Sequence, residues 1–260
     1  MPVHEPSPSF GAALKEALRG SHRDFTAGPL GTAILILAIP MVLEMVMESV
    51  FAVVDVFFVG RLGAEAVATV GLTESMLAVV YTIAVGLAIG ATAMVARRFG
   101  EGDRDGAAHA AAQALTLGLS VSVVIGIAGA LLAPRLLALM GASPAVIATG
   151  SNYTRMMLAG NASIVMLFLG NAIFRGAGDA AIAMRVLWLA NALNILLGPC
   201  LIFGLGPFPR LGVTGAAVAT LTGRTIGVVY QLWVLGRGTE RIQVHLRDFR
   251  LVPQIGRAHV

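Results

Sequence analysis

Three carboxylates, Glu44, Glu48 and Asp55, interrupt an otherwise apolar stretch that runs from residue 30 to residue 59. At 100° per residue, an α-helix brings these three side chains within about 40° of one another. Acidic side chains are costly in lipid, so we expect this stripe to face protein or a water-filled cavity. Carboxyl groups that share such a cavity interact strongly and can carry protons, which predicts a cation-coupling role. The plainer alternative is that Glu44 or Asp55 pairs with an arginine or caps a neighbouring helix.

Pro40 lies one turn before Glu44 in the same stretch. A proline removes one amide donor and disrupts the backbone hydrogen bond of the preceding turn, so we expect a kink or hinge there. A hinge beside a titratable stripe would serve as a switch, although many membrane helices contain proline without such a role.

Other polar side chains lie in later apolar stretches, among them asparagines and Arg224. Asparagine amides can bond between helices, coordinate a cation or partner a carboxylate, and we expect the first role for Asn161 and Asn191. Arg224 lies in the middle of the last apolar stretch. We expect a structural ion pair for Arg224, and the other role considered is that it lines the cavity or offsets the acidic stripe.

The sequence contains no Ser/His/Asp set, no HExxH motif and no nucleotide-binding loop, so we expect no enzyme activity, no catalytic residue, no metal centre and no cofactor. The segment RGAGD from Arg175 resembles a phosphate loop only superficially, because it follows no predicted strand and lacks the Lys-Ser/Thr ending. The net charge of +4 comes from small clusters between apolar segments, which argues against a nucleic-acid partner.

The composition places these side chains in a membrane protein. Of the 260 residues, 57% are hydrophobic and 12% are charged, whereas soluble domains carry about 25% charged residues. A bilayer crossing takes about 20 apolar residues, and the chain offers six such stretches. We predict an all-α, polytopic fold with spans at 30–59, 66–96, 108–133, 148–174, 180–205 and 212–236, separated by breakers that include Pro134.

Small residues recur at four-residue spacing in two of these spans. Gly86 and Gly90 lie in the second span, and Gly215, Ala219 and Gly223 lie in the sixth. Because small side chains let backbones approach, both patterns predict close helix contacts.

Lys and Arg alternate between rich and poor segments along the chain, and the first, third and fifth loops hold one each. By the positive-inside rule, both termini are then cytoplasmic, as six spans require. We expect residues 1–29 to form a cytoplasmic tail, residues 30–236 to form the membrane lobe, and residues 237–254 to form a cytoplasmic linker. Within the tail, GAALKEALRG is either a solvated arm with no role, which we favour, or a short amphipathic helix at the membrane surface.

The stretch from Pro40 to Leu72, P-x14-D-x4-GRLGAEAVATVGL, resembles the first helix and outer loop of the multidrug and toxin extrusion (MATE) transporters. Further matches follow in family order: RRFGEGD after the second span, NAIFRGAGDA from Asn171, ALNILLGPCLIFG from Ala192 and LGVTGAAVAT from Leu211. The resemblance implies a transporter of two six-helix lobes in the bacterial inner membrane, of which this chain is the amino lobe.

Residue by residue, the resemblance implies that Asp55 is the aspartate of the amino-lobe cation site and that Pro40 is the proline at the bend of the first helix. The lobe asparagines of the family fall on Asn171 and Asn194. An acid that the family has one turn after Asn194 is here Gly198.

Two departures qualify this resemblance. The first is Gly198, which stands where the family has an acid, and Glu48 or Glu44 could compensate for that acid. The second lobe is absent, and residues 255–260, IGRAHV, resemble a translated sequencing adapter, so we expect a non-native tail on a truncated gene fragment.

The leading hypothesis is an antiporter, coupled to H+ or Na+, that exports amphipathic or cationic drugs and toxins. Its expected partners are these small molecules, membrane lipids and the missing carboxyl-terminal lobe. The alternatives are a flippase for lipid-linked precursors or polysaccharide from the same superfamily, and an inert fragment.

Overall fold

The computed structural model describes residues 10–20, 30–239 and 241–249, and every regular element within these ranges is a helix. The helices are α1 (Phe10–Arg19), α2 (Leu30–Gly60), α3 (Ala64–Gly100), α4 (Arg104–Leu139), α5 (Pro144–Ala159), α6 (Asn161–Gly176), α7 (Ala180–Phe203), α8 (Val213–Arg237) and the short 3-10 helix η1 (Leu246–Phe249). The prediction of an all-α fold is confirmed.

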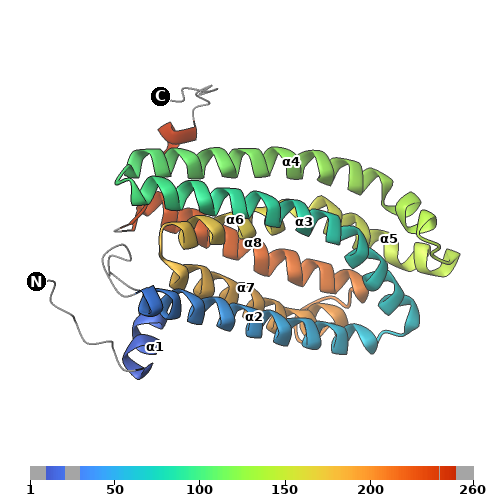
Figure 1. The fold of residues 1–260 in the computed structure, drawn as a ribbon. Helices are drawn as coiled ribbons and strands as arrows, with labels where there is room; N and C mark the ends of the chain where they lie inside the picture. Colours follow the sequence, from blue (N-terminus) through green and yellow to red (C-terminus); the bar gives the residue numbers. More distant parts are fainter. Residues whose placement is uncertain (1–9, 21–29, 240, 250–260) are drawn as a thin grey trace, which may run out of the picture.

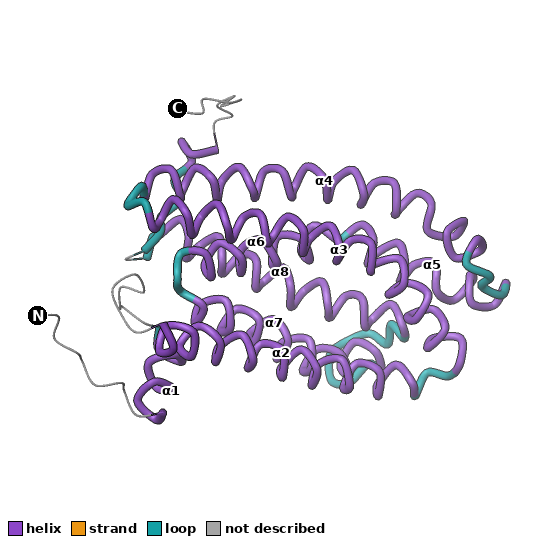
Figure 2. Tube along the Cα trace, viewed as in Figure 1, coloured by secondary structure: helices purple, strands orange, loops and turns teal. Residues whose placement is uncertain are grey.

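The long helices run side by side, and the loops that join them gather at the two ends of the bundle (Figures 1 and 2). Counting α5 and α6 as one segment, five are long and apolar enough to cross a membrane: 34–60, 64–100, 104–139, 144–176 and 180–203. The sixth predicted span forms α8, whose 25 residues suit a crossing in length. Arg224 and Gln231 make it less apolar than the other five.

The fourth predicted span, 148–174, is divided into α5 and α6 at Gly160. A Cβ at Gly160 would overlap the side chain of Leu221, so the turn between α5 and α6 packs closely against α8. Asn161 stabilises the junction, because its Nδ2 donates to the carbonyl oxygens of Ser122 at 3.0 Å and Leu158 at 2.7 Å. The expected helix-joining role of Asn161 is confirmed.

The predicted breaker at Pro134 is wrong, because α4 continues through it to Leu139. Turn glycines mark the true helix ends: Gly141 after α4 has φ 83° and Gly178 after α6 has φ 82°. A left-handed backbone is costly for other residues, so the segment RGAGD ends α6 and makes the turn into α7 at Gly178.

Close helix packing is confirmed for the glycines of α8 and is not seen for those of α3. A methyl group at Gly215 would overlap the carbonyl oxygen of Leu201, and one at Gly223 would overlap that of Ala190. Both carbonyls belong to α7, so these glycines set the α7–α8 distance. At Gly90 an added methyl group would meet no described atom within 4 Å.

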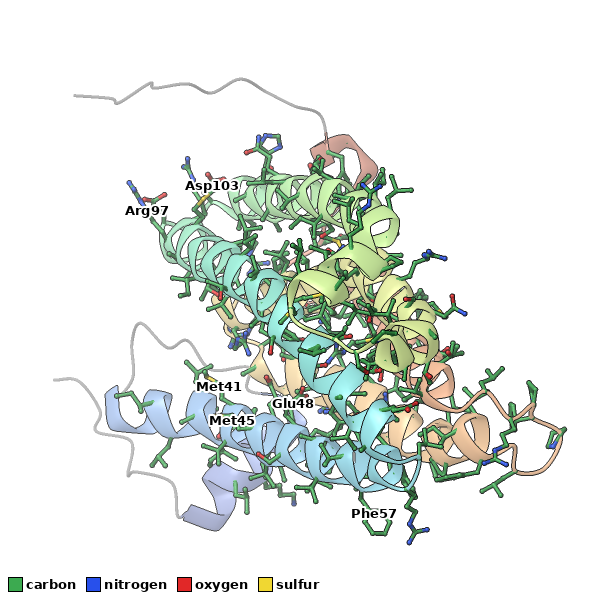
Figure 3. The ribbon with its side chains drawn as sticks, turned by 90° about the vertical axis from the view of Figure 1, so that its right-hand side faces the viewer. Met41, Met45, Glu48, Phe57, Arg97 and Asp103 are labelled. Atoms are coloured by element: carbon green, nitrogen blue, oxygen red, sulfur yellow. The ribbon has the colours of Figure 1, made fainter. Side chains whose placement is uncertain are left out.

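Helix α2 is attached to the bundle chiefly through α7. Trp188 of α7 donates its ring N–H to the carbonyl oxygen of Leu43 at 3.3 Å. Towards its amino end α2 diverges from α3, and Figure 3 shows the two helices separating there. A cavity of about 600 Å³ lies between them, lined by Leu37 and Met41 of α2 and by Val85 to Ala93 of α3.

The segment after α8 folds back onto the lobe. Val244 donates its amide to the carbonyl oxygen of Leu235 at 3.0 Å, and Ile242 is 3% exposed. Residues 255–260, the expected non-native tail, lie outside the described residues, as does most of the expected amino-terminal tail; α1 coincides with the alternative considered there, a short amphipathic helix.

The glycine contacts yield a stability prediction. Gly223→Ala should lower the free energy of unfolding by about 1–3 kcal/mol, because the added methyl group pushes α7 and α8 apart. The matched control is Gly90→Ala, which should be neutral or stabilise by up to about 1 kcal/mol. Thermal or denaturant unfolding in detergent measures both, and equal effects would contradict the packing role of Gly223.

Candidate functional site

The acidic stripe of α2 faces the interior of the lobe. Glu44 is only 6% exposed, Glu48 and Asp55 are half-buried, and residues between them, such as Met45, face outward. Figure 3 shows Glu48 on the side of α2 that faces the other helices, whereas Phe57 points away from them. The prediction that the acidic stripe faces protein or a cavity is therefore confirmed.

Glu44 forms an ion pair with α6. Its Oε2 lies 3.0 Å from Nη1 of Arg175, whose side chain is 24% exposed. Its other oxygen, Oε1, is buried without a hydrogen-bond partner among the described residues. Pairing with an arginine, the alternative role considered for Glu44, is therefore observed.

Glu48 is held by α7, because Asn191 donates its Nδ2–H to Oε2 of Glu48 at 2.9 Å. Asn191 does more than the helix bonding expected of it, since its partner is a carboxylate of the stripe. The amide of Asn191 engages one of the two oxygens of the Glu48 carboxylate.

Asp55 lines a cavity of about 320 Å³ together with other residues of α2 and residues from three further helices, α3, α5 and α8. Glu48 lies beside Asp55 in this wall, Glu74 comes from α3 and Arg224 comes from α8. The rest of the lining is Phe51, Ala52, Val56, Val70, Tyr81, Tyr153, Met157 and Thr220. Three carboxylates and one guanidinium therefore share one polar chamber inside the lobe.

Arg224 is fixed in the wall of this chamber by Tyr81. Its Nη2 donates to the Tyr81 hydroxyl at 3.1 Å, and its guanidinium lies 5.9 Å from the centre of the Tyr81 ring. Within the described residues no carboxylate approaches it closely enough for an ion pair, and its buried Nη1 has no hydrogen-bond partner. The structural ion pair expected for Arg224 is not found among the described residues, whereas the other role considered, lining the cavity, is observed.

A second cavity of about 180 Å³ adjoins the first. Glu44, Asn171 and Arg175 line it, and Glu48 and Arg224 belong to both cavities. Glu48 and Arg224 therefore stand at the boundary between two chambers.

The two expected asparagines occupy different places. Asn171 lines the second cavity and accepts a hydrogen bond from Nε2 of Gln231 at 2.6 Å. Asn194 is buried and donates to the Thr220 hydroxyl at 2.7 Å, and Thr220 lines the chamber of Asp55. Beside Asn194, Gly198 leaves room for a side chain, since an added Cβ would meet only the Asn194 oxygen, at 3.9 Å.

Sequence reasoning missed Glu74, Tyr81 and Arg175. Glu74 had a usable signal, because it is an acid inside the second apolar stretch. Tyr81 and Arg175 carried none, since a tyrosine in a span and an arginine at a span end are both ordinary.

Carboxylate, guanidinium and amide groups line these two chambers. The described residues contain no group of three or more His, Cys, Asp or Glu side chains arranged to hold a metal ion. The carboxylates instead alternate with guanidinium and amide groups. Of these groups, the carboxyl groups are the ones that can readily gain or lose a proton.

Comparisons with known proteins agree with this architecture. A family model described as MatE matches residues 40–200. A protein of Shewanella oneidensis described as an FAD transporter is 31% identical over 195 residues, which are 75% of this chain and 43% of that protein. A probable multidrug resistance protein NorM of Thermotoga maritima is 30% identical over 208 residues, 78% of this chain and 44% of that protein.

Solved structures give the same result. A crystal structure of MATE in complex with MaL6 has a TM-score of 0.80 and 34% identity, covering 92% of this chain and 50% of that one. A MOP superfamily transporter from Pyrococcus furiosus has a TM-score of 0.79 and 32% identity, covering 96% of this chain and 52% of that one. The chain thus spans about half the length of the relatives it matches.

The contact between Arg224 and Tyr81 yields a second prediction. Tyr81→Phe should lower the free energy of unfolding by about 1–3 kcal/mol, because it removes the hydroxyl that accepts a hydrogen bond from the half-buried guanidinium of Arg224. Tyr230→Phe is the matched control, since Tyr230 stacks on Trp233 through its ring, and its effect should stay within about 0.5 kcal/mol. Unfolding in detergent compares the two variants, and a neutral Tyr81→Phe would show that Arg224 is held by other groups.

Proposed function

This chain belongs to the MATE family of transporters, and on that premise we propose that it works as the cation-binding lobe of an antiporter that exports amphipathic, often cationic compounds. It is an integral membrane protein. We place it in the bacterial inner membrane with both termini in the cytoplasm, on the basis of the Lys and Arg distribution.

One observation carries the proposal: Asp55, Glu48 and Glu74 share a chamber of about 320 Å³ inside the helix bundle. Ionisable side chains inside a membrane usually have a functional role, because their desolvation is costly and a structural role alone rarely offsets that cost. The chamber is large enough to hold water and an exchangeable cation. In this proposal Asp55 and Glu48 bind the coupling ion, H+ or Na+.

The mechanism we propose uses α2 as the moving part. Cation binding at Asp55 changes the charge of the chamber, and α2 responds by bending near Pro40. Helix α2 is suited to this, because it is attached chiefly through α7 and diverges from α3 at its amino end. Bending would change the chamber and expel substrate, as the two lobes of the transporter rock around the binding site.

The second lobe is part of this proposal. Alternating access needs two bodies that move against each other, and this chain spans about half the length of its relatives. We therefore propose that its partner is a carboxyl-terminal lobe of the same transporter, and that the chain alone does not complete a transport cycle.

A second cargo class is favoured by a specific observation. The relative from Shewanella oneidensis is described as an FAD transporter, and FAD carries negative phosphates. Arg175 and Arg224 line the second cavity and could partner such an anion. An anionic dinucleotide is therefore the alternative substrate.

Efflux from cells tests the proposal. Cells that lack their main drug pumps and express this chain joined to the carboxyl-terminal lobe of a MATE transporter should expel ethidium, and Asp55→Asn should reduce expulsion to the rate of the empty vector. The reason is that asparagine keeps the shape of Asp55 but cannot exchange a proton. Fluorescence of intracellular ethidium gives the rate, and released FAD measured in the same cells tests the alternative cargo.

The control variant is Glu65→Gln, because Glu65 is exposed at the start of α3, outside both chambers. It should expel ethidium at the wild-type rate. Undiminished efflux by Asp55→Asn, at equal membrane levels, would eliminate the coupling role of Asp55.

A further inference from the structure

Three cavities lie in series along one face of α2. The chamber of about 320 Å³ is lined by Asp55, the next of about 180 Å³ by Glu44, and the cavity of about 600 Å³ by Leu37 and Met41. From Leu37 to Asp55 a helix rises about 27 Å, close to the roughly 30 Å thickness of the hydrocarbon core. The series therefore extends across most of a bilayer within this single lobe.

Each boundary between neighbouring cavities carries an arginine. Glu48 and Arg224 line both the first and the second cavity. Phe168 and Arg175 line both the second and the third. Because Arg175 is paired with Glu44 at 3.0 Å, the second boundary is closed by an ion pair.

We propose that Glu48 is the transfer point of a proton path that runs inside this lobe from Asp55 through Glu48 to Glu44. The proposal rests on the proposed cation coupling of Asp55 and deepens it, because it assigns the proton as the coupling ion and gives its route. Arg175 closes the end of the path next to Pro40.

Each step exchanges one proton between two carboxyl groups. The O–H bond of a protonated Asp55 breaks, a new O–H bond forms on the Glu48 carboxylate, and Asp55 is left as the carboxylate. The same exchange then runs from Glu48 to Glu44. Water can carry the proton between them, since the first chamber has room for about ten molecules and the second for about six, at roughly 30 Å³ each.

The groups that face Glu48 favour this relay. They come from every helix around it: Asp55 and Glu44 on α2, Glu74 and Tyr81 on α3, Tyr153 on α5, Arg175 on α6, Asn191 on α7 and Arg224 on α8. Asn191 orients one oxygen of Glu48 at 2.9 Å and leaves the other for exchange.

The fixed arginines explain why the path suits a proton better than a metal cation. A metal cation would have to move past the positive charge of Arg224 at the first boundary and of Arg175 at the second, and Coulomb repulsion opposes both approaches. A carboxyl group that receives a proton becomes neutral, so relay through Glu48 avoids this repulsion.

Once Glu44 is protonated, its attraction to Arg175 is reduced to a hydrogen bond between a neutral and a charged group. The second boundary then loosens one turn after Pro40, where we propose that α2 bends. Proton arrival and bending of α2 are thereby linked through one contact.

Proton flux through the purified 260-residue chain tests the path. The chain is reconstituted in vesicles of phosphatidylethanolamine and phosphatidylglycerol that contain the pH indicator pyranine, and a potassium gradient with valinomycin drives protons inward. Wild type should pass few protons, because the ion pair closes the path. Arg175→Gln should raise the flux roughly tenfold or more, since glutamine keeps an amide donor to Glu44 but removes the charge.

The decisive variant combines Arg175→Gln with Glu48→Gln, which should return the flux to the wild-type level. Glutamine can still accept the hydrogen bond from Asn191 but cannot relay a proton. Glu48→Asp in the same background restores a carboxyl group and should recover part of the flux. Glu65→Gln combined with Arg175→Gln is the matched control, and its proton flux should equal that of Arg175→Gln alone.

Folding of each variant is checked by its melting temperature in detergent. If Arg175→Gln does not fold, Glu44→Asp serves instead, because its shorter side chain releases Arg175 while keeping a carboxyl group. The path is overturned if Glu48→Gln leaves the raised flux of Arg175→Gln or Glu44→Asp unchanged. It is also overturned if these two variants fold but pass no more protons than wild type. Flux that depends on Glu48, found together with absent ethidium export, supports the path and contradicts the drug-export proposal.

Discussion

The cost of placing charged side chains inside a bilayer is the constraint on which this structure depends. Helix α2 meets it by separating its two faces. Met45 and Val53 on the outer face are each 71% exposed, whereas Glu44 on the inner face is 6% exposed. In water such an arrangement would be reversed, so the pattern itself indicates lipid outside and a polar interior within.

The polar interior is assembled from helices that are distant in sequence. Arg175 of α6 meets Glu44, and Asn191 of α7 meets Glu48. Arg224 of α8 reaches the chamber of Asp55 while bonding Tyr81 of α3. Each partner comes from a different helix, so the acids of α2 are accommodated only when the whole lobe is folded.

The sequence by itself determined the features that depend on local pattern. Helical periodicity placed Glu44, Glu48 and Asp55 on one face, and lipid required that face to turn inward, as it does. Runs of apolar residues predicted the all-α membrane lobe, and Glu74 could have been found by the same reasoning. These inferences succeed because spacing along one helix and cost in lipid are both readable without knowing any neighbour.

The tertiary structure alone decided which partner each side chain meets. Asn171 and Asn194, which the family resemblance assigned to one site, bond to Gln231 and Thr220 in separate places. Periodicity identifies the residues that share a helix face but not the helix that this face contacts. Contacts between residues more than one hundred positions apart, such as Arg175 with Glu44, are set by packing, and glycines such as Gly223 control how closely the helices approach.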